Sequence, residues 1–287
     1  MHKAGFVNIV GNPNVGKSTL MNQLVGEKLS IATFKAQTTR HRIMGIVNTE
    51  DTQIVFSDTP GVLKPNYKMQ EMMLQFSESA LADADILLYV TDVVEDPEKN
   101  MDFLEKVSKM SIPVILLINK IDESDQKTLG KLVTKWHGLL PNAEILPISA
   151  KNKFGVDILL KRVHELLPES PAFFDKDQLT DKPAKFFVSE IIREKILRYY
   201  DKEIPYSVEV VVERFKEDDR QIHINAVIYV ERSSQKGIII GHQGMALKKV
   251  STEARKSLER FFDKKIFLEI FVKVDKDWRN SQKELKH

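Results

Sequence analysis

The chain has 287 residues, 42% of them hydrophobic, which is enough for two packed domains. The absence of cysteine excludes disulfides and thiolate metal sites and fits a reducing cytosol, and no apolar run approaches the roughly 18 residues of a membrane span. The net charge of +2 conceals an asymmetry, because residues 1–184 carry 21 Lys and Arg against 24 Asp and Glu, whereas residues 185–287 carry the remaining 22 against 17.

The first predicted strand, Phe6–Val10, runs straight into a glycine-rich turn, so we expect no signal peptide at the N-terminus. The turn has the pattern G-x-x-x-x-G-K-S and opens a predicted helix near Lys17. Backbone N–H groups of such a turn hold a di- or triphosphate, the lysine reaches the β- and γ-oxygens, and the Ser18 hydroxyl can ligate Mg²⁺. The residues predicted to surround the phosphates are Gly11, Asn12, Pro13, Asn14, Val15, Gly16, Lys17, Ser18 and Thr19.

A D-x-x-G motif follows the second predicted strand, Gln53–Ser57. Asp58 is predicted to hold Mg²⁺ through water, and the Gly61 N–H is predicted to meet a γ-phosphate. The predicted nucleotide-contacting residues of this segment are Asp58, Thr59, Pro60, Gly61 and Val62.

Two further motifs indicate which base is bound. The apolar run Val114–Ile118 ends in an N-K-x-D motif, whose Asp122 carboxylate can accept both N1–H and N2–H₂ of guanine, a pairing that adenine cannot offer. The run Glu144–Ile148 leads into a segment whose backbone is predicted to contact the base edge. The predicted base-contacting residues are Asn119, Lys120, Ile121, Asp122, Ser149, Ala150 and Lys151. Four motifs in this order, each at the end of an apolar run, predict a GTP-binding domain.

The spacing of the apolar runs predicts the fold of this domain. Short strands such as Asp85–Val90 alternate with helical patterns up to the helix Val156–Leu167, which Pro168 stops. This alternation is typical of an α/β doubly wound, mostly parallel sheet. We therefore predict a GTP-binding domain over residues 1–168 and a linker or surface strap over residues 169–184, which has two prolines and no periodicity.

With these motifs in place, the chain resembles the Era-like GTPases, a branch of the translation-factor-related P-loop GTPases, over essentially its whole length. The resemblance implies hydrolysis of GTP to GDP and phosphate with Mg²⁺ as cofactor. Residues 37–42, Gln-Thr-Thr-Arg-His-Arg, are similar to the first switch segment of that family. By this similarity Thr39 closes on Mg²⁺ and the γ-phosphate, with Thr38 as the alternative; otherwise both merely begin the strand Ile43–Val47. The predicted metal ligands are Ser18, Thr39 and Asp58.

Val62 stands where many GTPases place the Gln that orients the attacking water. Valine has no hydrogen-bonding group, so we expect slow intrinsic turnover. In the Era-like GTPases an Asn at the position of Asn14 resembles a potassium ligand, which would supply charge beside the phosphates. The equal alternative is that Asn14 is a turn residue that tolerates unusual backbone angles. The predicted catalytic residues are Asn14, Lys17, Thr39 and Gly61.

Residues 185–287 follow a different pattern, predicting a helix over Phe186–Tyr200, strands over Ser207–Glu213 and Gln221–Val230 with a charged turn at Lys216–Arg220, a helix over Met245–Phe262 and a last strand over Ile266–Val274. The apolar stretch Gly237–Ile240 precedes a G-x-x-G loop and the basic helix. This order resembles a prokaryotic, type II KH domain of α+β class, which implies binding of single-stranded RNA.

Glycines at both ends of the G-x-x-G loop let a nucleic-acid backbone approach, and the following helix N-terminus favours phosphate. The apolar side of the groove stacks unpaired bases, and lysines of the basic helix add phosphate contacts. His242 and Gln243 can equally be solvated tip residues without base contacts. The predicted RNA-binding residues are Ile239, Ile240, Gly241, His242, Gln243, Gly244, Lys248 and Lys249.

The resemblance implies a monomeric, cytoplasmic GTPase switch that binds the 3′ end of small-subunit ribosomal RNA and acts in maturation of the small ribosomal subunit. An alternative is a constitutive RNA-binding protein whose nucleotide site is structural. A third hypothesis is a peripheral GTPase of the inner membrane, which ranks low because the sequence has no lipidation motif or strongly amphipathic basic helix to support it.

Overall fold

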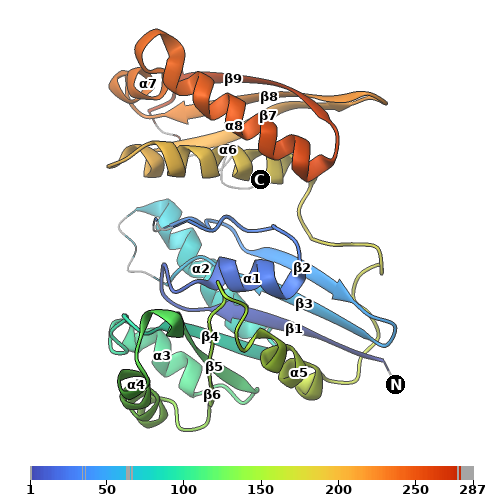
Figure 1. Ribbon diagram of the computed structural model, residues 1–287, viewed down its shortest axis with the longest axis vertical. Helices are drawn as coiled ribbons and strands as arrows, with labels where there is room; N and C mark the ends of the chain where they lie inside the picture. Colours follow the sequence, from blue (N-terminus) through green and yellow to red (C-terminus); the bar gives the residue numbers. More distant parts are fainter. Residues whose placement is uncertain are drawn as a thin grey trace. The chain divides into compact units, whose positions relative to one another are not determined.

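A computed structural model describes residues 2–33, 35, 37–62, 65, 67–276 and 278 (Figure 1). The chain forms two compact units, Met1–Asp181 and Lys182–His287, each with its own sheet. The predicted linker 169–184 spans the end of the first unit and the start of the second.

The described part of the first unit is built on a six-stranded sheet with the order β2-β3-β1-β4-β5-β6 (Figure 1). Its strands are β1 (Lys3–Val10), β2 (Ile43–Asn48), β3 (Thr52–Asp58), β4 (Ile86–Asp92), β5 (Val114–Asn119) and β6 (Glu144–Pro147). β1 pairs in parallel with β3 and β4, and β5 and β6 continue the parallel sheet, whereas β2 runs antiparallel to β3 at the edge. The predicted doubly wound, mostly parallel sheet is confirmed.

The helices of this unit are α1 (Lys17–Val25), α2 (Lys68–Ala82), α3 (Met101–Ser108), α4 (Gln126–Leu139) and α5 (Val156–Leu166), with a short 3₁₀ helix η1 (Ile121–Glu123). Residues of α2, α3 and α4 share one apolar cluster with β4 and β5. β3 and β4 are buried at every position, as expected for strands covered on both faces.

Residues 169–181 lie along the first unit as a strap. Gly45 of the edge strand β2 bridges Thr180, the Ile46 N–H donates to the Leu179 carbonyl at 2.8 Å, and the Met44 N–H donates to Asp181 Oδ1 at 2.9 Å. The strap therefore covers the exposed hydrogen-bonding groups of an edge strand. Nearer the start of the strap, the backbone N–H groups of Phe173 and Phe174 donate to Gln53 of β3. The Phe173 ring packs against Phe6 of β1.

The second unit, coloured yellow to red in Figure 1, has a three-stranded sheet with the order β7-β8-β9 in its described part. Its elements are α6 (Ala184–Tyr199), η2 (Ile204–Tyr206), β7 (Val208–Glu217), β8 (Gln221–Val230), α7 (Ser233–Ile240), η3 (His242–Gly244), α8 (Met245–Phe262) and β9 (Lys265–Val274). β7 is antiparallel and β9 parallel to β8. This is the predicted type II KH order.

One predicted boundary in this unit is wrong. The charged turn was predicted to begin at Lys216, but β7 continues to Glu217 and Lys216 pairs with His223 of β8. A bulge between Val212 and Arg214 shifts the register, and beyond it the strand is mostly exposed. Among the described residues, no helix has the length and apolar character needed to cross a bilayer.

Candidate functional site

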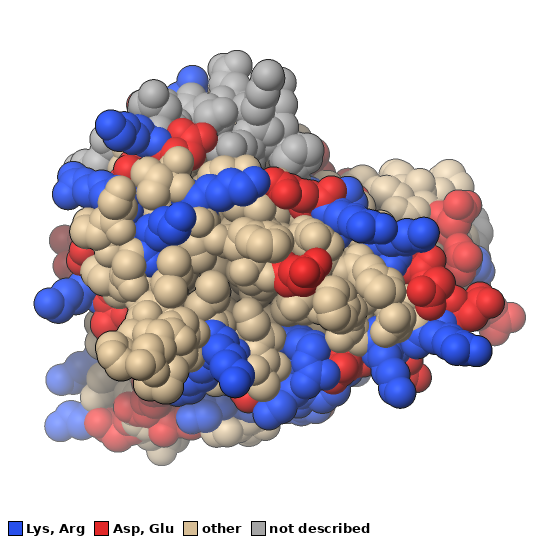
Figure 2. Space-filling view, turned by 90° about the horizontal axis from the view of Figure 1, so that it is seen from above, with Lys and Arg blue, Asp and Glu red and all other residues tan. Residues whose placement is uncertain are grey.

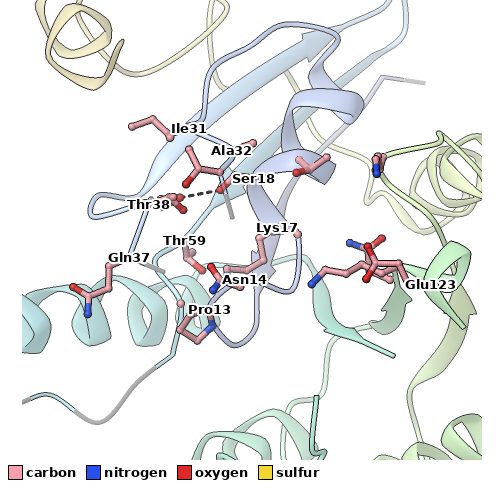
Figure 3. Close-up of a pocket in the computed structure, with 18 of the residues that line it drawn as sticks. Pro13, Asn14, Lys17, Ser18, Ile31, Ala32, Gln37, Thr38, Thr59 and Glu123 are labelled. Carbon is pink, nitrogen blue, oxygen red and sulfur yellow. Dashed lines mark hydrogen bonds between the residues drawn. The ribbon is translucent and has the colours of Figure 1, made fainter. Parts of the chain in front are cut away.

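A pocket of about 400 Å³ opens at the carboxyl ends of β1, β3 and β5 (Figure 3). In open parallel sheets this edge is where ligands bind, because the loops that leave neighbouring strands converge there. The loops after these three strands supply the three nucleotide motifs that the sequence places there, and the segment between α1 and β2 closes another side.

Lys17 is held inside the turn that leaves β1. Its ammonium donates to the carbonyls of Gly11 at 3.0 Å and Asn12 at 2.7 Å, and the side chain is buried. Burial lowers the pKa of Lys17 to about 8, although the nearby carboxylates of Asp58 and Glu95 act in the opposite direction. A buried cation that is satisfied mainly by neutral carbonyls is well suited to an anionic ligand.

Gly16 lies in this turn and has a φ of 97°, in the left-handed region. A Cβ at this position would lie 2.2 Å from Asn119 Nδ2. Glycine therefore lets the loops after β1 and β5 approach each other closely.

Ser18, Thr39 and Asp58 converge from three segments. The Ser18 hydroxyl donates to Asp58 Oδ2 at 2.8 Å and lies 2.9 Å from Thr39 Oγ1, the contact dashed in Figure 3, and Thr39 Oγ1 donates to the same carboxylate oxygen at 3.2 Å. Thr39 is buried here, and it is Thr39 rather than Thr38 that makes these contacts.

This cluster fits a hard divalent cation. The other oxygen of Asp58, Oδ1, is buried and has no hydrogen-bond partner among the described residues. Burial raises the pKa of Asp58, opposed by the nearby Lys17 charge and by hydroxyl hydrogen bonds. Two hydroxyls and a buried carboxylate are the oxygen ligands that Mg²⁺ takes, alone or through water.

The residues that follow β5 form the end of the pocket that was predicted to hold the base. Asn119 Nδ2 donates to the Val15 carbonyl at 2.8 Å, and Asn119 Oδ1 accepts from the Ala150 N–H at 2.9 Å, so one buried amide ties three loops together. Asp122 Oδ1 accepts from the Ser149 hydroxyl at 2.6 Å, while the carboxylate lines the pocket. The Ser149 bond holds the Asp122 carboxylate at the pocket wall, where it was predicted to meet the base.

The structure places two residues whose roles the sequence left open, Val62 and Asn14, in different surroundings. Val62 is buried in the apolar cluster beneath the pocket, and its N–H donates to the Gly11 carbonyl at 3.1 Å. Asn14 is exposed at the pocket wall and has a left-handed φ of 66°. Its backbone therefore fits the turn prediction, and its side chain is free to face a ligand.

Most predicted nucleotide-contacting residues line the pocket. They are Pro13, Asn14, Gly16, Lys17, Ser18, Thr19, Thr39, Thr59, Gly61, Asn119, Lys120, Asp122 and Lys151. The others lie behind the lining: Gly11, Asn12, Val15, Asp58, Pro60, Val62, Ile121, Ser149 and Ala150. Several of these hold lining residues in place through the bonds described above.

Sequence reasoning missed several lining residues, namely Ile31, Ala32, Thr33, Met73 and Glu123. Gln37, which the switch resemblance included without a role, lines the pocket as well. The first four belong to no sequence motif. They lie in the segment after α1 and in α2, and the fold brings them to the pocket. Glu123 had a signal, since it directly follows Asp122.

The G-x-x-G loop is exposed on the second unit. Gly241 has a φ of 71°, and a Cβ there would lie 2.6 Å from the Cβ of Ala246, so the turn into α8 requires glycine. His242 and Gln243 are exposed between the two glycines, and Gln243 itself has a left-handed φ of 50°. The loop thus presents its backbone to solvent directly before the N-terminus of an 18-residue helix.

The predicted apolar contact to RNA needs a correction. Ile239 is fully buried in the core of the second unit, so its side chain is closed to a ligand, whereas Ile238 is 50% exposed. Successive residues of α7 are rotated by about 100° about the helix axis, so Ile238 is exposed while Ile239 faces the core. Ile240 is half-buried, and Lys248 and Lys249 on α8 are exposed. Figure 2 shows an area of mostly uncharged residues on the face that it presents, with Lys and Arg side chains and some Asp and Glu side chains around it.

The fold and the site together define a P-loop GTPase joined to a KH domain. Two family models agree: residues 6–120 match the model described as 50S ribosome-binding GTPase, and residues 203–279 match the KH domain model. The chain is 44% identical over 288 residues to GTPase Era of Clostridium kluyveri, covering 100% of this chain and 98% of that protein. It is 46% identical over 286 residues to GTPase Era of Geobacter sp. (strain M21), covering 99% and 96%.

Solved structures give the same result. A crystal structure of Era in complex with MgGDPNP and nucleotides 1506–1542 of 16S ribosomal RNA matches with a TM-score of 0.94 at 36% identity, over 100% of this chain and 98% of that one. An Aquifex aeolicus Era variant bound to GDP·AlF4⁻ matches with a TM-score of 0.94 at 37% identity, over 99% and 98%. The chain belongs to the Era family of GTPases, and its activity is the hydrolysis of GTP.

Proposed function

We propose that this GTPase is a nucleotide-controlled switch that binds the 3′ end of small-subunit ribosomal RNA and acts in assembly of the small ribosomal subunit. The observation that carries the RNA part is the exposed Gly241–Gly244 loop, whose two glycines and following helix suit the passage of a phosphate backbone. The relative crystallised with a 16S ribosomal RNA fragment supports the choice of RNA.

In this proposal the pocket of the first unit binds GTP or GDP with Mg²⁺. Ser18 and Thr39 supply hydroxyl oxygens to the metal, and Asp58 holds it through water. Lys17 and the N–H of Gly61 stabilise charge on the γ-phosphate, and the remaining P-loop N–H groups hold the other phosphates. The relative solved with MgGDPNP supports the metal, and the two hydroxyl oxygens hydrogen-bonded to Asp58, those of Ser18 and Thr39, support these ligands.

We further propose that Asn14 helps to hold a potassium ion beside the phosphates. Exchanging sodium for potassium at constant ionic strength should then raise the rate of GTP hydrolysis. Asn14→Gly keeps the left-handed turn, because glycine adopts positive φ without strain, but it removes the side-chain amide. We expect this variant to bind GTP and to lose the potassium stimulation. Hydrolysis that responds equally to both cations in the wild type would leave Asn14 with a turn role alone.

The switch itself is tested by the affinity for RNA in different nucleotide states. The affinity for a labelled single-stranded RNA with the 3′-end sequence of small-subunit ribosomal RNA would be measured with a GTP analogue, with GDP and without nucleotide. We expect tighter binding with the GTP analogue and a steep loss of affinity as salt rises, because the contacts are to phosphates. Equal affinity in all three states would support the alternative, a constitutive RNA-binding protein with a structural nucleotide site.

The same proposal includes a monomeric protein of the cytoplasm. Peripheral association with the inner membrane is the alternative to a purely cytoplasmic location. The proposed potassium ion is argued from Asn14 alone.

A further inference from the structure

Arg42 is a buried arginine at the end of segment 37–42, and no role was predicted for it from the sequence. It lies directly before β2, three residues after Thr39, and it is 9% exposed. Its Nε donates to the Ser57 hydroxyl at 2.6 Å, and Nη2 donates to Asn8 Oδ1 at 3.1 Å. The guanidinium thus lies across β3 and β1, next to the strand end that carries Asp58.

The same guanidinium reaches the C-terminal end of α2. Nη1 donates to Asp83 Oδ2 at 2.6 Å and Nη2 donates to Asp83 Oδ1 at 2.9 Å, a bidentate pair on the residue that ends the helix. Asn8 completes the arrangement, because its Nδ2 donates to the Ala80 carbonyl and to Asp83 Oδ1, both at 2.7 Å. The Asn8 amide therefore satisfies one carbonyl near the helix C-terminus, and the positive charge of Arg42 lies beside the same end.

α2 is in turn bonded to the D-x-x-G motif. The hydroxyl of Ser77, in the second half of the helix, donates to the Pro60 carbonyl at 2.8 Å, and Ser77 is fully buried. Pro60 precedes Gly61, whose N–H is proposed to meet the γ-phosphate. Arg42 therefore connects two segments of the pocket: through three residues of chain it reaches Thr39, and through Asp83 and Ser77 it reaches Gly61.

We propose that Arg42 is a positioning residue for GTP hydrolysis, which holds the end of segment 37–42 against β1, β3 and α2 so that Thr39 and Gly61 keep a fixed relation. The inference rests on the proposed roles of Thr39 and Gly61. A bidentate fork on one carboxylate, plus two further bonds, requires the planar guanidinium, so lysine is a poor substitute. Because the base and the diphosphate are held by other loops, binding of GDP does not depend on this link.

The test uses the full-length protein and three quantities: the kcat of GTP hydrolysis, the Mg²⁺ concentration for half-maximal hydrolysis, and the affinity for GDP. Asp83→Asn removes the charge of the carboxylate that accepts both guanidinium bonds. Because the Asp83 side chain is 48% exposed, we expect this variant to keep the fold. Arg42→Lys and Arg42→Ala remove progressively more of the contacts. Arg162→Ala is the matched control, because Arg162 is likewise paired with carboxylates, those of Glu144 at 2.7 Å and Glu165 at 2.9 Å, but on the surface. Thr39→Ala is the reference for loss of the metal contact.

We expect Arg42→Lys and Arg42→Ala to lower kcat by about tenfold or more and to raise the Mg²⁺ requirement, since small misplacements of catalytic groups cost up to about 100-fold. Asp83→Asn should move both quantities in the same direction by less, GDP affinity should stay within about twofold, and Arg162→Ala should match the wild type. The inference is overturned if Thr39→Ala raises the Mg²⁺ requirement while the Arg42 and Asp83 variants do not. It is also overturned if those variants weaken GDP binding as much as hydrolysis, which indicates a purely structural role. If Thr39→Ala itself has no effect, the proposed metal site is what fails.

Discussion

Asp122→Asn is expected to reverse the base preference of the nucleotide site. The Ser149 hydroxyl is bonded to Asp122 Oδ1, so an asparagine that keeps this bond places its amide nitrogen where Oδ2 faces the base. The N2–H₂ donor of guanine then faces the N–H₂ donor of the asparagine, which is unfavourable. The O2 of xanthine can instead accept a hydrogen bond from the asparagine amide. We expect a change in relative preference of at least about 2 kcal/mol, roughly 30-fold, measured by titration with guanine and xanthine nucleotides.

A neighbouring carboxylate supplies the control for this experiment. Glu123 lines the same pocket and follows Asp122 directly, so Glu123→Gln makes the same chemical change one residue away. We expect this variant to keep its preference for guanine. Unchanged GTP affinity in Asp122→Asn, or an equal loss in both variants, would contradict the assignment of Asp122 to the base.

The double variant His242→Asp with Gln243→Asp is expected to abolish most of the affinity for RNA. Both side chains are exposed, and aspartate tolerates the left-handed backbone of Gln243, so the loop should keep its conformation. Two carboxylates would then stand where phosphates must pass, and we expect a loss on the order of 100-fold near physiological salt. GTP hydrolysis without RNA should persist, because the pocket belongs to the other unit. The measurement is equilibrium binding of labelled single-stranded RNA.

Ser233→Asp with Ser234→Asp is a charge-matched control in the same unit. These serines are exposed in the first turn of α7, where acidic side chains favour the helix, and the eight-residue helix separates them from the loop. We expect at most a small loss of RNA affinity in this control. If the loop variant binds single-stranded RNA as tightly as the wild type, the Gly241–Gly244 loop is not the binding site.

Local patterns were sufficient to predict the elements that carry the motifs. The turn at Gly11–Ser18, the strand at 114–118 and the helix Met245–Phe262 each have a periodicity or a glycine pattern that depends on neighbours in sequence. The choice of Thr39 over Thr38 was based only on similarity to the family's first switch segment. The contacts of Thr39 with Ser18 and Asp58 depend on tertiary structure.

The features that could not be predicted arise from long-range packing. The bonds of Arg42 join residues 34 and 41 positions away, and the strap pairs with β2 across more than 130 residues. Ile239 is buried because that side of α7 packs into the core of the second unit. A run of three isoleucines does not reveal which of them faces the core. β7 continues past a bulge between Val212 and Arg214, and the alternation of residues in the sequence does not show the extra residue.

The burial of Lys17 has a consequence for the protons exchanged when nucleotide binds. The groups of the protein set the pKa of this ammonium at about 8, and the charges of a polyphosphate raise it again. Below that pH the lysine already carries its proton, whereas at higher pH the arriving nucleotide must draw one from the solvent. The heat of binding then contains the ionisation enthalpy of the buffer, and nucleotide affinity falls as the solution becomes alkaline. We therefore expect nucleotide binding to be coupled to proton uptake through Lys17.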